Sequence, residues 1–312
     1  MQFHINHIPE KPDFEIHHGH QVMLTGSCFS ENIGALLKDH QFKTVSNPRG
    51  LLFNPLSIYQ CLDDLVRAKQ PDERFILKRG DLFLSYLHHS SLHSTSKGDL
   101  VKKINAQDQQ AGSFLKEADY LIITFGTAFV YHHRQLDAVV ANCHKQAAQL
   151  FEKKLLDPEQ ITGLYLELTD RLKVVNPRLK ILFTLSPVKY LKDGLIENNL
   201  SKSVLTLSIH QLIRQRPHCF YFPAYELVND DLRDYRFYKK DLAHPNELAI
   251  DYVWQKFSEC YFSEAAKNLN RQIHKLNLAL SHRKLMQNED DPKLRDFIDR
   301  QKEEIAKQMD QR

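Results

Sequence analysis

The chain has 312 residues, of which 42% are hydrophobic, so it can bury a large core. It carries 42 Lys and Arg against 39 Asp and Glu, and this small excess of positive charge argues against nucleic-acid binding. No basic segment followed by an apolar run opens the chain, and no apolar run reaches the roughly 18 residues that span a bilayer. The five cysteines are scattered and odd in number, which indicates reduced thiols. We therefore expect a cytoplasmic protein without a membrane span.

The first candidate site follows an apolar strand signal over 22–24 that ends at a glycine. A helix is predicted over 31–38, with Ser30 as its cap. Its first-turn N–H groups lack partners and its dipole favours an anion, so we expect a stabilised thiolate at Cys28 and a place for an oxyanion. The alternative interpretation is that Ser27 only caps the helix and that Cys28 is a small buried hydrophobe.

Strand and helix signals alternate along the rest of the chain. Short apolar runs predict five strands, over 22–24, 42–45, 120–125, 180–185 and 219–222. Apolar residues at helical spacing predict helices over 55–67, 108–118, 144–155, 158–175 and 198–214. The alternation predicts a three-layer α/β/α fold with a mostly parallel central sheet, in which ligands bind beyond the carboxyl ends of the strands.

Two segments depart from this alternation. Residues 75–86 predict a hairpin that turns at Gly80-Asp81, either as an inserted flap beside the site, together with 88–97, or as a plain edge hairpin. From residue 263 onward the composition becomes charged, and a sparse apolar stripe predicts a helical tail. We expect a catalytic domain over 1–262 and a tail over 263–312 that docks on the domain or pairs with a second copy as a homodimer. The alternative for the tail is a partly frayed terminus.

The second candidate site lies near the end of the domain, where Asp241 precedes His244 by three residues. Pro245 and Asn246 are expected to start a helix over 247–257, which places His244 on the loop before it. Nucleophilic catalysis needs such a pair, because the imidazole takes the proton of the nucleophile while the carboxylate fixes its tautomer. The alternative is a pair of solvated cap residues.

Turn residues and a Cys-His pair supply further candidates. Gly50 lies in a turn and allows the backbone to approach a ligand, although an ordinary turn uses the same residues. Its neighbour Arg49 is either a partner for an acidic substrate group or a solvated side chain. Asn142, Cys143 and His144 lack partners at the spacing of zinc ligands, so we expect no metal and no cofactor.

Taken together, these segments resemble a known class of proteins. Hydrolases of the SGNH or GDSL class have an early Gly-Asp-Ser block and a late Asp-x-x-His-Pro-Asn block, and this chain resembles most closely the GSCFA family. The likeness covers most of residues 20–262, with blocks at 26–34, 52–57, 124–128, 140–145, 186–188, 221–226, 233–238 and 241–246. The resemblance implies an SGNH-hydrolase-like, flavodoxin-like fold. It also implies Cys28 as the nucleophile, with Ser27 in reserve.

One departure from the hydrolase pattern concerns the oxyanion site. The class has Gly-x-Asn where this chain has Gly126-Thr127-Ala128, and Ala128 has no side-chain donor. The resemblance then leaves the backbone N–H groups of Cys28 and Gly50 as donors. Thr127, Asn54 and Asn142 are candidate side-chain substitutes. Without a substitute the chain is expected to be a slow enzyme or a binding protein, because one such donor contributes about a hundredfold to a thousandfold in rate.

The function that these residues favour is acyl chemistry. We expect Cys28 to attack the acyl carbon of an ester or thioester, with His244 as base and Asp241 as its orienting partner. The substrate is expected to be a small or carbohydrate-linked acyl compound, and the reaction is either hydrolysis or transfer to an acceptor. The alternative is an inert carbohydrate-binding or scaffolding protein that keeps the hydrolase fold.

Overall fold

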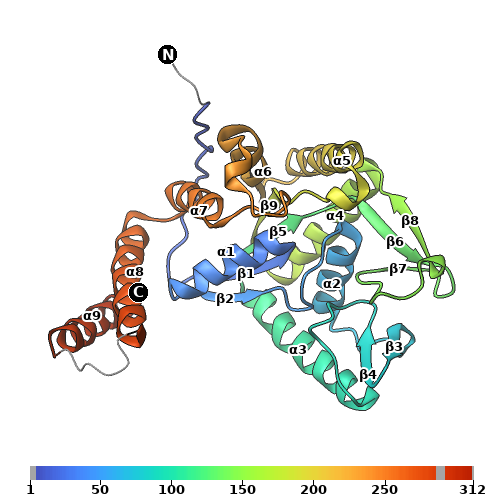
Figure 1. The fold of residues 1–312 in the computed structure, drawn as a ribbon, viewed down its shortest axis with the longest axis horizontal. Coiled ribbons are helices and arrows are strands. Elements are labelled where there is room, and N and C mark those ends of the chain that lie inside the picture. The colour runs from blue at the N-terminus through green and yellow to red at the C-terminus, as the bar shows by residue number, and fades with distance from the viewer. Residues whose placement is uncertain (1–4, 286–291, 311–312) are drawn as a thin grey trace.

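A computed structural model describes residues 5–285 and 292–310. Its centre is a five-stranded sheet in the order β10-β9-β5-β1-β2, in which every neighbouring pair is parallel (Figure 1). The strands are β1 (Gln21–Gly26), β2 (Lys43–Ser46), β5 (Tyr120–Phe125), β9 (Lys180–Leu185) and β10 (Cys219–Phe222). All five predicted strands are confirmed. Counted within the sheet the order is 2-1-3-4-5, the flavodoxin-like order, whose switch point lies between β1 and β5.

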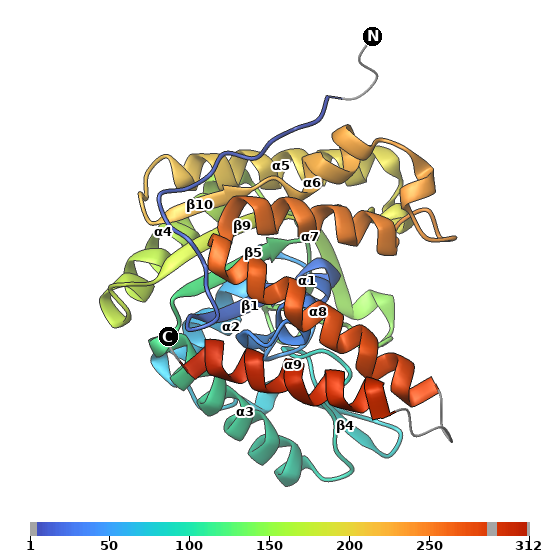
Figure 2. The same ribbon diagram turned by 90° about the vertical axis from the view of Figure 1, so that its left-hand side faces the viewer.

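Helices cover both faces of the sheet, which confirms the three-layer prediction. One face packs against α2 (Pro55–Arg67), α3 (Lys97–Glu117), α4 (Pro158–Val175) and α5 (Leu195–Ile213). The other packs against α1 (Cys28–Asp39) and α7 (Glu247–Tyr261), which Figure 2 shows from their side. Successive side chains of a strand point to opposite faces of the sheet, so each strand contributes to both cores. In β1, Met23 packs on the first face, and Val22 and Leu24 pack on the second.

The helix α1 begins earlier than the sequence predicts. Its first residue is Cys28, and Ser27 is the N-cap, with its Oγ accepting the Phe29 N–H at 3.4 Å. Ser30 therefore lies inside the helix and is not its cap. Its hydroxyl instead donates to the Thr25 carbonyl and contacts Thr124 Oγ1 at 2.6 Å, which ties the first turn of the helix to the ends of β1 and β5.

Two small sheets extend the domain. The hairpin of β3 (Ile76–Arg79) and β4 (Leu82–Ser85) confirms the predicted one. A three-stranded antiparallel sheet in the order β7-β6-β8 contains β6 (Phe129–His133), β7 (Ala138–Val140) and β8 (Phe151–Leu155). The helix predicted over 144–155 is therefore wrong. His144 and Lys145 both adopt left-handed backbone conformations, with φ of 48° and 56°, and the residues that follow pair along β6.

The tail is helical and docks on the domain, as predicted. Helices α8 (Glu264–Leu285) and α9 (Pro292–Asp310) lie side by side (Figure 2) and share a core of Leu269, Ile273, Leu276, Ile298 and Ile305. The Asn277 side chain donates to the Asp39 carbonyl at the end of α1, at 2.9 Å. Pairing of the tail with a second copy stays a prediction, as does the division of the chain at residue 262.

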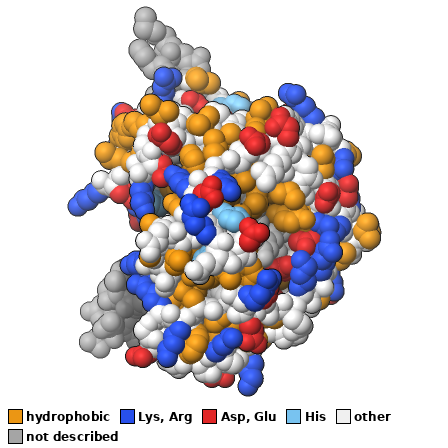
Figure 3. All heavy atoms as spheres, turned by 90° about the vertical axis from the view of Figure 1, so that its right-hand side faces the viewer, with side chains coloured by type: hydrophobic (Ala, Val, Ile, Leu, Met, Phe, Trp, Pro, Cys, Tyr) orange, Lys and Arg blue, Asp and Glu red, His pale blue; other side chains and the backbone are white. Residues whose placement is uncertain are grey.

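The remaining elements are short: α6 (Ala224–Glu226), η1 (Glu73–Phe75), η2 (Ala148–Leu150), η3 (Leu191–Asp193), η4 (Leu227–Leu232) and η5 (Tyr235–Phe237). Within residues 5–285 and 292–310, no helix has the length and hydropathy that crossing a membrane requires. Figure 3 shows that Lys and Arg are interspersed with Asp and Glu on the face it displays. The expected absence of nucleic-acid binding stays a prediction.

Candidate active site

The carboxyl ends of β1 and β5, at the switch point, are closed by the segment that leads into α2. The Leu52 N–H donates to the Gly26 carbonyl at 3.0 Å. The Phe53 carbonyl accepts the N–H groups of Gly126 at 2.8 Å and Thr127 at 2.9 Å. Three separate segments of the chain thus meet where a ligand of this fold is expected to bind.

Cys28 opens α1 at this edge, and its side chain is partly exposed. Its pKa is raised above the usual value, first by burial and then by the negative charge of Glu31. Burial and this charge therefore oppose the stabilised thiolate that the sequence predicts. A protonated thiol needs a base that removes its proton during attack.

Ser27, the reserve nucleophile, has no exposed surface. Its backbone N–H donates to the Thr124 carbonyl, and its hydroxyl is the helix cap described above. The alternative interpretation thus applies to Ser27, while Cys28 remains accessible.

Asp241 and His244 form a hydrogen-bonded pair on the loop before α7. His244 Nδ1 lies 2.7 Å from Asp241 Oδ2, and Asp241 Oδ1 accepts the backbone N–H groups of His244 and Ala243, both at 3.0 Å. These N–H groups, with the imidazole, hold the pKa of Asp241 well below its usual range. About half of each side chain is exposed, so the second ring nitrogen, Nε2, is the one left for a substrate or nucleophile. The predicted helix start is confirmed: α7 begins at Glu247 with Asn246 as its N-cap, and it ends four residues later than predicted, at Tyr261.

Backbone contacts bring the His244 loop to the edge where Cys28 lies. The Lys239 N–H donates to the His244 carbonyl at 2.7 Å, and the Lys189 N–H, after β9, donates to the Ala243 carbonyl at 3.0 Å. Lys239 is close enough to lower the pKa of the Cys28 thiol, and Cys28 contributes to the raised pKa of Tyr190. The thiol, the histidine loop and the loop after β9 therefore gather at one edge of the sheet.

Two residues that no sequence motif singled out, Lys202 and Tyr190, support this edge. Lys202 is buried, and its Nζ donates to the carbonyls of Gly126 and Ser186, both at 2.7 Å, which joins the ends of β5 and β9. A Cβ at Gly126 would lie 2.4 Å from the Tyr190 hydroxyl and 2.9 Å from the backbone carbonyl oxygen of Phe53, so any other residue at 126 would force a shift. Lys202 shares a buried face of α5 with Asn198, Leu205 and Ile209, and this helical spacing is the signal that identifies it.

Lys202 is expected to make the stability of the protein depend on pH. Burial lowers its pKa to about 7, whereas a lysine in the unfolded chain has a pKa of about 10.4. Between these values the unfolded state binds more protons, so stability rises with pH, by at most about 1.4 kcal/mol per pH unit. In Lys202→Met this contribution disappears. Urea denaturation at about pH 7 and about pH 9 measures the change in the free energy of unfolding with pH. If this change is the same in the wild type and in Lys202→Met, the prediction is contradicted.

The sequence matches the GSCFA family over residues 21–257, which is most of the chain. The chain belongs to the GSCFA family. A comparison with proteins of curated function gives no match. Among solved structures, a carbohydrate esterase of family 3 from Talaromyces cellulolyticus aligns with 82% of this chain and 99% of its own, at 9% identity and a TM-score of 0.40. The acetyl xylan esterase Est2A from Butyrivibrio proteoclasticus aligns with 80% of this chain and 64% of its own, at 11% identity and a TM-score of 0.41. We draw no functional conclusion from likenesses this distant.

In this GSCFA-family chain several candidate oxyanion donors are already occupied. The Gly50 N–H donates to the Asn47 carbonyl at 2.7 Å, as in an ordinary turn. The Thr127 hydroxyl lies 3.1 Å from the Ser201 hydroxyl and accepts the Phe129 N–H. We therefore do not assign the Gly50 N–H or the Thr127 hydroxyl as an oxyanion donor.

Asn142 and Ala128 likewise have structural contacts. Asn142 Oδ1 accepts the backbone N–H of His144 at 2.8 Å, and the His144 ring bonds to the Ser85 carbonyl at the end of the hairpin. The Ala128 N–H donates to the Ser201 hydroxyl at 2.7 Å. The Asn142 block therefore anchors the β3–β4 hairpin through the oxygen of the side chain, and the role of Asn142 as an oxyanion donor stays a prediction.

Asn54 is a further side-chain candidate. It is the N-cap of α2, and its Oδ1 accepts the Ser57 N–H at 2.9 Å. This contact uses only the oxygen, so the Nδ2 group keeps its donors. Asn54 directly follows Phe53, whose carbonyl binds the end of β5, and it therefore lies at the same edge as Cys28.

All five cysteines, which lie within the described residues, are free thiols. In residues 5–285 and 292–310, no group of three or more His, Cys, Asp or Glu side chains has a geometry suited to a metal ion.

The charge of Glu31 is expected to control the reactivity of Cys28. In Glu31→Gln the pKa of the thiol should fall, because a negative charge that disfavours the thiolate is removed. Alkylation by iodoacetamide then reaches half its maximal rate at a lower pH than in the wild type. Peptide mapping of Cys28 across a pH series measures this midpoint. A midpoint that is unchanged or higher contradicts the prediction.

Proposed function

We propose that this protein is an acyl-transferring enzyme in which Cys28 is the nucleophile, His244 the general base and Asp241 the orienting acid. The observation that carries the proposal is the 2.7 Å hydrogen bond between Asp241 Oδ2 and His244 Nδ1. It fixes the tautomer in which Nε2 accepts a proton, on a loop that is bonded to the edge where Cys28 opens α1.

The proposed reaction has two halves. His244 Nε2 takes the thiol proton as Cys28 Sγ attacks the acyl carbon, and the tetrahedral oxyanion accepts hydrogen bonds from the Cys28 N–H and Asn54 Nδ2. The intermediate collapses to a thioester on Cys28, and His244 returns the proton to the leaving alcohol. In the second half a water or an acceptor hydroxyl gives its proton to His244 and attacks the thioester, which releases the acyl product and the free thiol.

The substrate is proposed to be an acyl ester of a small alcohol or of a carbohydrate. Water as the second reactant makes the enzyme an esterase, and a sugar or other hydroxyl makes it an acyltransferase. The raised pKa of Cys28 supports general-base catalysis rather than a preformed thiolate–imidazolium pair, since the thiol is protonated at neutral pH.

A second candidate function is an inert binding or scaffolding protein. One observation favours it: Ala128 stands where the hydrolase class supplies its side-chain oxyanion donor, and its own N–H is bonded to Ser201. If Asn54 does not replace that donor, the rate falls by about a hundredfold to a thousandfold.

Turnover of an aryl acetate distinguishes the two functions. Cys28→Ala is expected to lose at least about a hundredfold in kcat/KM, because the covalent route is removed. Cys143→Ala is the matched control, since Cys143 is the other partly exposed thiol, and it should retain the wild-type rate. If the wild type and Cys28→Ala share the same background rate, the inert function is favoured.

A further inference from the structure

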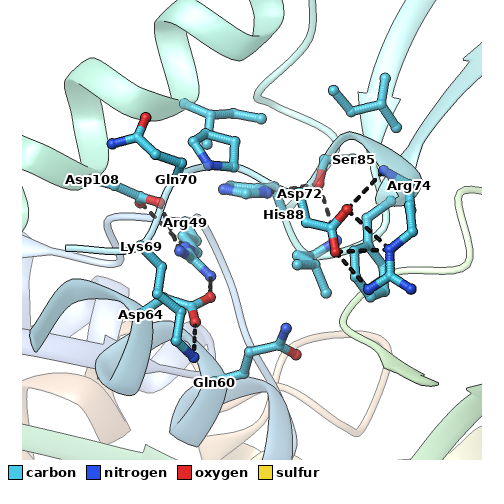
Figure 4. A pocket seen from close by; sticks show the side chains of 15 residues that line it. Arg49, Gln60, Asp64, Lys69, Gln70, Asp72, Arg74, Ser85, His88 and Asp108 are labelled. Carbon is cyan, nitrogen blue, oxygen red and sulfur yellow. Dashed lines mark hydrogen bonds and ion pairs between the residues drawn. The ribbon is translucent and has the colours of Figure 1, made fainter. Parts of the chain in front are cut away.

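A cavity lies between α2, α3 and the β3–β4 hairpin (Figure 4). Its volume is about 270 Å³, just below the roughly 300–1,000 Å³ of sites for drug-sized ligands. The described residues that line it include Arg49, from the loop after β2, but not Cys28, Asp241 or His244. The cavity is therefore separate from the proposed active site and has room for one small ring.

The charged groups around the cavity are already paired. Three cations meet three acids there: Arg49 bonds to Asp64 and Asp108, Lys69 to Asp64, and Arg74 to Asp72. Arg49 is buried, with 5% of its side chain exposed, so it is neither solvated nor free for an acidic substrate. A phosphate or a metal cation would have to break one of these pairs to bind. The electrostatics thus favour an uncharged ligand.

One buried polar atom in the wall has its hydrogen-bonding capacity unused. The side chain of His88 is 3% exposed, and its Nδ1 lies 2.9 Å from the Ser85 hydroxyl, while Nε2 has no partner among the described residues. Figure 4 shows the ring extending from Ser85 toward the Arg49–Asp108 pair, so that Nε2 faces the cavity. Burial lowers the pKa of His88 to about 3, and the ring is therefore neutral at physiological pH. A ligand hydroxyl can satisfy this atom in either tautomer, because it both donates and accepts.

The rest of the wall combines acceptors, donors and an apolar surface. The carboxylates of Asp64 and Asp108 keep lone pairs for further hydrogen bonds beyond those from Arg49. Phe75 and Ile104 add apolar side chains to the lining. The wall thus offers fixed carboxylates, the edge of an imidazole and the face of an aromatic ring. Such a wall suits a ligand ring that has hydroxyls on its edge and C–H groups on its face.

We propose that this cavity is a binding site for one uncharged sugar unit, recognised through its hydroxyl groups. The site lies beside the loop from β2 to α2, whose other end closes the switch point of the sheet. It does not depend on the catalytic proposal, because none of its lining residues takes part in the acyl chemistry.

Saturation-transfer NMR with methyl glycosides of neutral pyranoses tests the proposal. Gln70 lies at the exposed rim of the cavity, so Gln70→Trp should fill the entrance without disturbing the core. Gln160→Trp is the matched control, because Gln160 is also exposed but lies on α4, away from the cavity. The wild type, Gln160→Trp and Cys28→Ala should all bind at least one glycoside, and Gln70→Trp should bind it at least about tenfold more weakly.

Three outcomes overturn the proposal. The first is that no neutral glycoside binds the wild type, which leaves a cavity that holds only ordered water. The second is that Gln70→Trp binds as well as the control. The third is that inorganic phosphate binds here in preference to the glycosides, as judged by competition. A crystal soaked with the bound glycoside supplies a check that does not depend on variants: sugar density against His88 Nε2 supports the site, and water alone overturns it.

Discussion

Replacing His244 with alanine is expected to lower kcat/KM for an aryl acetate by about 10²–10⁴, the usual contribution of a general base. The loss should be large here because the Cys28 thiol has a raised pKa and is protonated at neutral pH. In the proposed mechanism the imidazole accepts the proton of the thiol, and the variant lacks that acceptor. Steady-state rates across a pH series measure the effect, and the deficit of the variant should shrink as rising pH ionises the thiol directly.

Two further variants separate catalysis from general damage. Asp241→Asn should also lose activity, because the carboxylate fixes the tautomer and stabilises the imidazolium. His132→Ala is the control, since His132 also contacts a carboxylate, that of Asp137 at 3.2 Å, within the β7-β6-β8 sheet. If His244→Ala and His132→Ala have the same rate as the wild type, His244 is not the base.

Replacing Arg49 with methionine is expected to lower the free energy of unfolding by about 3–5 kcal/mol. The guanidinium is buried and bonds to Asp64 at 2.8 Å and to Asp108 at 2.6 Å, and neither acid is more than 11% exposed. Removal of the cation leaves Asp64 with Lys69 alone and Asp108 without its partner, in surroundings that disfavour charge. Urea denaturation measures the loss.

Arg74→Met is the matched control for this prediction. Arg74 also bonds to an aspartate, Asp72 at 2.7 Å, but 74% of its side chain is exposed. Solvent screens exposed pairs of this kind, so this variant should unfold close to the wild type. A loss in Arg49→Met no larger than that in Arg74→Met shows that the buried pair does not stabilise the fold.

The fold was largely predictable because its sheet is parallel and buried on both faces. Such strands are nearly continuous apolar runs, and they stand out between helical patterns. The failure over 144–155 has a different origin: Phe151–Leu155 pairs with Phe129–His133, and this long-range pairing overrides the local preference for a helix. The start of α1 was misplaced because Ser27 and Ser30 are both good caps, and only contacts with Thr25 and Thr124 decide between them.

The candidate site was predictable only where its contacts are local. The bond between Asp241 and His244 spans three residues on one turn, so sequence spacing alone suggests it. The Thr127 hydroxyl lies beside that of Ser201, a contact between distant segments that no spacing encodes. Gly50 and Asn142 bond locally, to Asn47 and His144, but whether such a turn also serves a ligand depends on what packs around it. Lys202 supports Gly126 and Ser186 across two strands, a contact that no short motif encodes.

Mass spectrometry of the enzyme quenched during turnover of an aryl acetate is the most direct measurement of the proposed chemistry. We expect one acetyl group on the peptide that contains Cys28, at higher occupancy in a variant whose deacylation is slowed than in the wild type. We expect no such adduct in Cys28→Ala or at Cys143. Two results would contradict the proposed chemistry. One is an acetyl group on another residue that forms and decays at the rate of turnover. The other is a Cys28→Ala variant that turns over the aryl acetate at the wild-type rate without any adduct.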